Sequence, residues 1–138
     1  YTYDLWKESM FTFEQIQDQL ISGKSSDPDK DGFSNLFEYA FGGRALVKDN
    51  NLSPSAKIII KEGAEFLAIE YQQRLGANDI IYVIEHSTDL STWESVDRLG
   101  LEQIFDNGDG TISYSYRILN IDDLGKQSYL RVKVVGRL

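Results

Sequence analysis

The first 43 residues carry apolar side chains at the spacing of short helices. One stripe, at intervals of three, four and one, consists of Phe13, Ile16, Leu20 and Ile21. Thr12 and Gln15 stand in capping-box spacing before the stripe and Gly23 follows it, so a helix is predicted between them. A second helix is predicted from Ser34 to Phe41, where Gly42 ends the apolar run.

From Lys57 onward the pattern changes to period two. Short segments rich in β-branched and aromatic residues alternate with turn residues, and the predicted strands include 58–60, 66–75, 80–86, 93–96, 99–105, 111–119 and 129–135. Such a series is typical of an antiparallel β-sandwich. We therefore expect a mainly β single domain, residues 1–138, in which a helical unit (1–43) packs on a sandwich (57–138). Trp6 is interpreted as an anchor in the core, because large aromatic side chains dominate core burial.

Carboxylates alternate in the loop between the two predicted helices. Asp27, Asp29 and Asp31 are followed by Gly32, where the chain turns with positive φ, and Glu38 closes the run. This spacing fits the EF-hand pattern, in which calcium takes about 6–8 oxygen ligands. The expected ligands are Asp27, Asp29, Asp31, the carbonyl of Phe33, Asn35 directly or through water, and Glu38 with both oxygens.

The alternative interpretation of the loop is a solvated acidic turn before a helix. We favour calcium because seven positions of the pattern agree at once. Ser34 departs from the pattern, since paired EF-hands carry an aliphatic residue at that position. The sequence therefore predicts a single, unpaired calcium loop.

Composition narrows the classes of partner. The net charge of −8 argues against binding to nucleic acid or to anionic membranes, which requires a basic surface. No apolar run reaches 18 residues, so no membrane span is expected. The absence of cysteine excludes disulfides and thiol catalysis.

Three segments together resemble a known bacterial module. Residues 27–42 read DPDKDGFSNLFEYAFG, residues 82–93 read YVIEHSTDLSTW, and residues 129–132 read YLRV. This combination resembles a module near the C-terminus of large secreted proteins of verrucomicrobial and planctomycete bacteria. The loop alone is similar to EF-hand, dockerin and thrombospondin type 3 calcium loops. The resemblance implies a secreted, non-catalytic appendage, with parent enzyme domains in the same chain that often act on polysaccharides.

A sugar site would need aromatic and polar side chains on an exposed strand face. In the last predicted strand, Tyr129, Arg131 and Lys133 point outward, and an aromatic ring beside two cations suits an acidic or sulfated polysaccharide. The alternative is a solvated strand face. Another aromatic face, Ile112, Tyr114, Tyr116 and Ile118, is interpreted as core because isoleucines flank the tyrosines.

Catalytic residues are not evident in the sequence. His86 is the one histidine and has no recognisable nucleophile motif, so it is interpreted as structural or exposed. The first hypothesis is thus a calcium-stabilised carbohydrate-binding module of a secreted polysaccharide-degrading protein. The alternative is an interaction, docking or spacer module that binds no sugar, and an enzyme is a third, weaker hypothesis.

Overall fold

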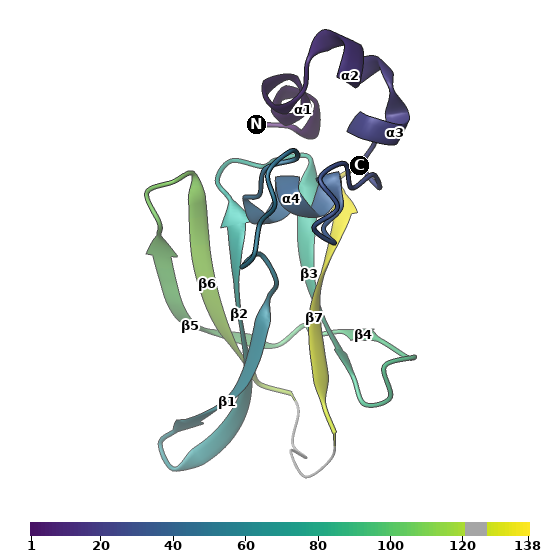
Figure 1. Cartoon of the computed structure of the whole chain (residues 1–138). Coiled ribbons are helices and arrows are strands. Elements are labelled where there is room, and N and C mark those ends of the chain that lie inside the picture. Colours follow the sequence, from purple (N-terminus) through teal and green to yellow (C-terminus); the bar gives the residue numbers. More distant parts are fainter. Residues whose placement is uncertain (121–126) are drawn as a thin grey trace.

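The computed structural model describes residues 1–120 and 127–138, and within them two antiparallel sheets form most of the structure. The first sheet has the order β1-β2-β6-β5 and the second the order β4-β3-β7 (Figure 1). The strands are β1 Ser55–Lys61, β2 Ala64–Arg74, β3 Ile80–Ser87, β4 Glu94–Ser95, β5 Leu99–Asp106, β6 Thr111–Ile118 and β7 Tyr129–Gly136. The predicted mainly β, antiparallel class is confirmed, and the two sheets are consistent with the predicted sandwich.

Burial along the strands follows the predicted alternation in part. On β2, Leu67, Ile69 and Tyr71 are buried and Glu70 is exposed, but Ala68, predicted on the face of Glu70, is fully buried as well. On β7, Val132 is buried and Lys133 is exposed. One face of each sheet therefore contributes to a common core, since successive side chains of a strand point to opposite faces.

Four short helices occur in the described residues, α1 Tyr3–Met10, α2 Phe13–Gln17, α3 Gln19–Ser22 and α4 Asn35–Phe41. The predicted capping box is confirmed at Thr12 and Gln15. The predicted continuous helix after Thr12 is wrong, because Asp18 leaves the helical conformation and its side chain accepts from Leu20 N as the N-cap of α3. Because of this break, the apolar residues of the predicted stripe no longer share one buried face, and Phe13 is 78% and Leu20 is 86% exposed.

Trp6 lies at the centre of a core that joins the helices to both sheets. Its indole is fully buried against Tyr3, Phe11 and Tyr39, at ring-centroid distances of 5.4, 6.2 and 5.9 Å. The same core contains Phe41 of α4 together with residues from both sheets. The prediction that Trp6 anchors the N-terminal segment in the core is confirmed.

The C-terminal end of α4 is held by side chains of the sheets. The last four carbonyl groups of a helix have no partner inside the helix. Here Arg74 donates to the carbonyls of Glu38 (3.3 Å), Tyr39 and Gly43 (3.1 Å). Gln72 of β2 donates to Phe41 O at 2.7 Å, and the Tyr82 hydroxyl of β3 donates to the carbonyl of Ala40. Both sheets thus bind the one helix that follows the acidic loop.

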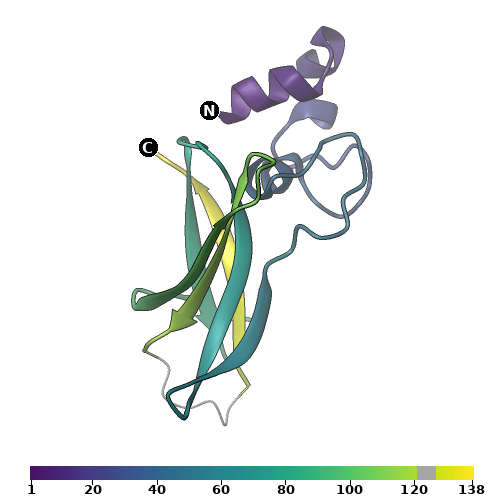
Figure 2. The ribbon, with the colours of Figure 1, turned by 90° about the vertical axis from the view of Figure 1, so that its left-hand side faces the viewer.

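The helices lie at one end of the sheets, where both chain ends are also found. Figure 2 shows α4 directly above the strands and the first helices beyond it, with N and C at that end. The backbone of Asn78 donates to Tyr1 O, and Arg137 N donates to Asp79 O. Helix α4, which follows the acidic loop, therefore lies between the first helices and the strands.

Candidate metal centre

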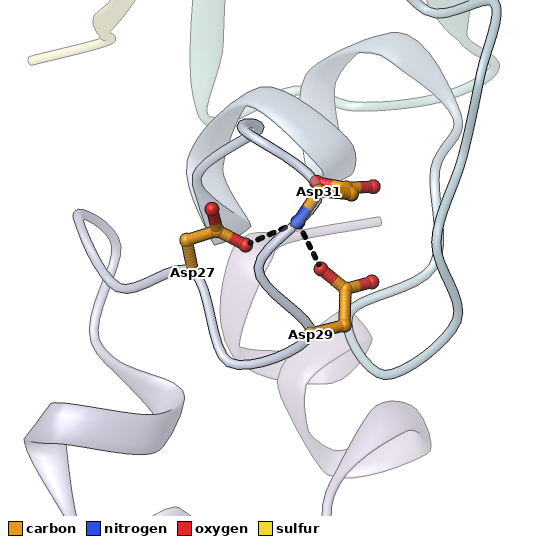
Figure 3. A group of neighbouring side chains, drawn as sticks. All are labelled: Asp27, Asp29 and Asp31. Atoms are coloured by element: carbon orange, nitrogen blue, oxygen red, sulfur yellow. Dashed lines mark hydrogen bonds between the residues drawn. The ribbon is translucent and has the colours of Figure 1, made fainter.

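Asp27, Asp29 and Asp31 lie around one tight loop, in which the carboxylates of Asp27 and Asp29 are directed at the backbone N–H of Asp31 (Figure 3). Asp31 N donates to Asp27 Oδ1 at 3.3 Å and to Asp29 Oδ1 at 3.2 Å, and Gly32 N donates to Asp27 Oδ2 at 3.0 Å. Gly32 has φ of 97°, which confirms the predicted positive φ at this turn. The three side chains each place one oxygen within 4.8 Å of the others, so the cluster can hold a metal ion.

A second carboxylate group shares Asp31 with the first. Oxygens of Asp31, Glu38 and Asp49 also lie within 4.8 Å of one another. Asp49 N donates to Asp31 Oδ2 at 2.8 Å, which attaches the segment after α4 to the loop. Asp49 was not among the predicted ligands, because it stands eleven residues after Glu38 in a polar stretch with no motif of its own.

Glu38 has the feature that distinguishes a cation site from a solvated turn. The residue is fully buried, and neither of its side-chain oxygens has a hydrogen-bond partner among the described residues. Asp29 Oδ2 is likewise buried without a partner. An unpaired buried carboxylate is strongly unfavourable unless it is neutralised by a proton or a cation. These orphaned oxygens therefore fit a bound cation better than a solvated acidic turn.

The raised pKa of Glu38 has the same cause, the burial of a carboxylate beside other carboxylates. Burial, followed by repulsion from Asp29, Asp31, Asp49 and Asp27, raises the pKa of the Glu38 carboxyl to about 8. Burial also raises the pKa of Asp29, with the neighbouring aspartates adding to the effect. Without a cation, the site therefore holds a proton near neutral pH.

The other two predicted ligands, Asn35 and Phe33, have partners in the surrounding structure. The Asn35 amide donates to the carbonyls of Ile21 (2.8 Å) and Gly23 (2.9 Å), while its buried Oδ1 has no partner among the described residues. Phe33 N donates to Asp31 Oδ1 at 2.9 Å, and its ring stacks on Phe37. Ligation by Asn35 and by the Phe33 carbonyl stays a prediction.

Backbone hydrogen bonds close the loop at its base. Asn35 N donates to Ser26 O at 2.8 Å, and Leu36 N donates to Lys24 O at 2.9 Å. Ser34 caps α4 by accepting from Phe37 N, which explains a polar residue at the position where paired EF-hands have an aliphatic one. These backbone hydrogen bonds and the Ser34 cap therefore hold the loop that carries the carboxylates.

The predicted sugar contacts of β7 lie on the outer face of the second sheet, but two of the three already have partners. Arg131 Nε donates to Glu85 Oε1 at 2.8 Å, and its guanidinium lies 4.0 Å from the ring centroid of Trp93. Tyr129 donates to Gln127, and Lys133 is exposed. The positive charge available on this face is therefore smaller than the sequence indicates.

His86 contacts a hydroxyl group that sequence reasoning did not find. Its Nε2 lies 3.1 Å from Ser128 Oγ, across the pairing of β3 with the residue before β7. Within the described part of the chain, no carboxylate bonds the second ring nitrogen to orient it. The pair therefore lacks the third group of a nucleophilic triad.

No family model, no curated protein and no solved structure matches the chain. Among the described helices, none has the length and apolar character needed to cross a membrane.

Proposed function

We propose that the protein is a non-catalytic, calcium-stabilised module of a secreted protein and that it binds polysaccharide. The observation that carries the calcium proposal is the buried Glu38 carboxylate, which has no hydrogen-bond partner in the described part of the chain and faces the acidic cluster. All the donors at this centre are oxygens, which hard cations prefer. Calcium suits the site better than magnesium. Calcium accepts irregular coordination by carboxylates, a carbonyl and an amide, whereas magnesium demands a nearly octahedral arrangement.

The proposed role of calcium is structural. The ion would be held by Asp27, Asp29, Asp31 and Glu38, with Asn35 and the Phe33 carbonyl as further oxygen donors. It would neutralise the repulsion among these groups, which otherwise opposes folding of the loop. Because both sheets bind the carbonyl end of α4, ordering the loop also holds the N-terminal helices on the sheets.

Calcium affinity is expected to rise with pH. The pKa of Glu38 in the metal-free fold is about 8, above its ordinary value of 4.5, so the folded state without calcium binds this proton more tightly than the unfolded chain. The proton's contribution to stability is complete below pH 4.5 and is lost as pH rises to about 8. Calcium must displace the proton, so affinity should rise by up to about tenfold per pH unit over this window.

Calorimetric calcium titrations at several pH values between 5 and 9 check this prediction. A flat affinity over the window would contradict it. Glu38→Gln has no titrating group at this position, so its calcium affinity should depend less on pH than that of the wild type.

Binding to polysaccharide rests on the outer faces of the sheets and on the resemblance described above. In a parent protein, a sugar-binding module makes the enzyme's second encounter with its substrate intramolecular and so raises the effective concentration. The alternative, a spacer or docking module, needs the same calcium site and the same fold. The two functions differ only in whether a polysaccharide is bound.

Affinity electrophoresis separates these functions. The calcium-loaded protein would be run through gels that contain xylan, mixed-linkage β-glucan, galactomannan, polygalacturonate, alginate or a sulfated galactan, with and without EGTA. We expect retardation by one class and its loss with EGTA. Mobility unchanged in every gel would overturn sugar binding, and release of reducing ends would overturn the non-catalytic assignment. Retardation by the acidic chains alone, lost in Lys133→Ala, would assign the β7 face.

A further inference from the structure

The outer face of the first sheet carries a band of polar side chains across three strands. Pairing places Ser115 of β6 between Glu70 of β2 and Gln103 of β5. One row further along, Ser113 lies between Gln72 and Phe105. Both rows point away from the core, because the buried Ile69 and Tyr71 alternate with them along β2.

Two adjoining hollows follow this band. The first, of about 200 Å³, is lined mainly by Glu70, Gln103, Phe105, Asn107, Ser113 and Ser115, together with Tyr114. The second, of about 150 Å³, is lined mainly by Asn51, Ser53, Ser55, Glu70, Gln72 and Ser113. Since Glu70 and Ser113 line both hollows, the two form one groove across the sheet from β5 to β1.

We propose that this groove binds a neutral polysaccharide chain. The inference rests on the proposed function and assigns it to a surface other than the β7 cluster. A chain of this kind presents hydroxyl groups along its edges and apolar C–H faces on its rings. Amides, hydroxyls and one carboxylate match the hydroxyl groups, and an aromatic ring matches a C–H face.

Some polar groups of the groove are already engaged, because Gln72 donates to Phe41 O and the side chains of Asn107 and Ser113 hydrogen-bond each other, whereas others have no such partner in the described part of the chain. Among the described residues, none forms a hydrogen bond with the Gln103 amide or the Ser115 hydroxyl. Glu70 contacts Lys57 at 3.7 Å through Oε2, which leaves Oε1 for a ligand. Phe105 is 58% exposed at the edge of the groove. Neither hollow is lined by a described Lys or Arg, so the groove favours a neutral chain over an acidic one.

The groove is connected to the metal centre through the segment after α4. Asp49, whose backbone N–H binds Asp31 in the acidic cluster, precedes Asn51 and Ser53 by two and four residues. Those two residues form one wall of the second hollow. Leu52 between them is buried, which fixes the wall against the core. Loss of calcium should therefore weaken sugar binding as well as stability.

The test compares wild type with Phe105→Ala and Gln103→Ala in gels that contain xylan, mixed-linkage β-glucan or galactomannan. Both positions are exposed on the edge strand β5, so folding should survive, and thermal melting checks it. Phe13→Ala, which removes an exposed ring from α2, is the matched control. We expect the dissociation constant to rise about tenfold in Phe105→Ala, to rise severalfold in Gln103→Ala and to stay unchanged in the control.

Each other outcome separates this inference from the proposed function. Retardation by a neutral chain that both β5 variants retain would overturn the groove while sustaining the module as a sugar binder. Retardation only by polygalacturonate, alginate or the sulfated galactan would also overturn the groove while sustaining the module as a sugar binder. No retardation in any gel would overturn both.

Discussion

Removal of calcium with EGTA is expected to lower the melting temperature by about 10 °C or more. A ligand that binds only the folded state stabilises it by about 4 kcal/mol when its concentration is a thousand times its dissociation constant. In a domain near this size, 1 kcal/mol corresponds to roughly 2–4 °C or slightly more. The structural reason is the cluster of five carboxylates, Asp27, Asp29, Asp31, Glu38 and Asp49.

Glu38→Gln tests whether this response comes from the predicted site. The substitution keeps the size of the buried side chain and removes its charge, so the variant should lose most of the calcium-induced rise in melting temperature. It should melt above the chelated wild type, because Glu38 must take up a proton to be buried without calcium, whereas glutamine is already neutral. Glu14→Gln, an exposed carboxylate on α2, is the matched control and should respond to calcium normally. A full response in Glu38→Gln would refute the site.

Trp6→Ala is expected to lower the free energy of unfolding by about 3–5 kcal/mol, as for other fully buried aromatic side chains. Its indole is fully buried and contacts Tyr3, Phe11 and Tyr39, so truncation leaves a cavity between α1 and α4. Because typical domains are stable by only about 5–15 kcal/mol, this variant should lie near its limit of stability. Urea unfolding in saturating calcium measures the change.

Trp93→Ala is the matched control for the same chemical change. Trp93, which precedes β4, is half-buried; Arg131 lies 4.0 Å from its ring centroid, and its indole N–H donates to Leu90 O at 3.3 Å. A cation–π contact of this kind contributes about 0.5–2 kcal/mol, so the loss should be clearly smaller than in Trp6→Ala. Equal losses in the two variants would contradict the assignment of Trp6 as the anchor of the helices.

Local patterns in the sequence were sufficient for the strands and for the acidic loop. Period two in residues 58–119 and 129–135 predicts strands that the structure confirms, because alternation depends only on neighbouring residues, although Ala68 is buried on the polar face of β2. Gly32 and the capping box at Thr12 were predictable for the same reason. The sequence alone also brings Asp27, Asp29 and Asp31 together, since a loop of this length leaves them no room to separate.

The break at Asp18 shows where local patterns were insufficient. The residues on both sides fit one helical stripe, yet a side-chain cap competes with continuation of the helix, and spacing alone does not show which prevails. The result exposes Phe13 and Leu20, which the stripe had assigned to a buried face.

Contacts between distant segments were decided only by the tertiary structure. Asp49 joins the acidic cluster, Arg74 binds the carbonyl end of α4, and Glu85 pairs with Arg131 although 46 residues separate them. No local signal marks these partners, because each depends on how the strands bring remote residues side by side. The sequence by itself determined the acidic loop and the alternation of the strands. Tertiary packing decided that Glu38 is buried without a hydrogen-bond partner from residues 1–120 or 127–138 and that a polar groove crosses the first sheet.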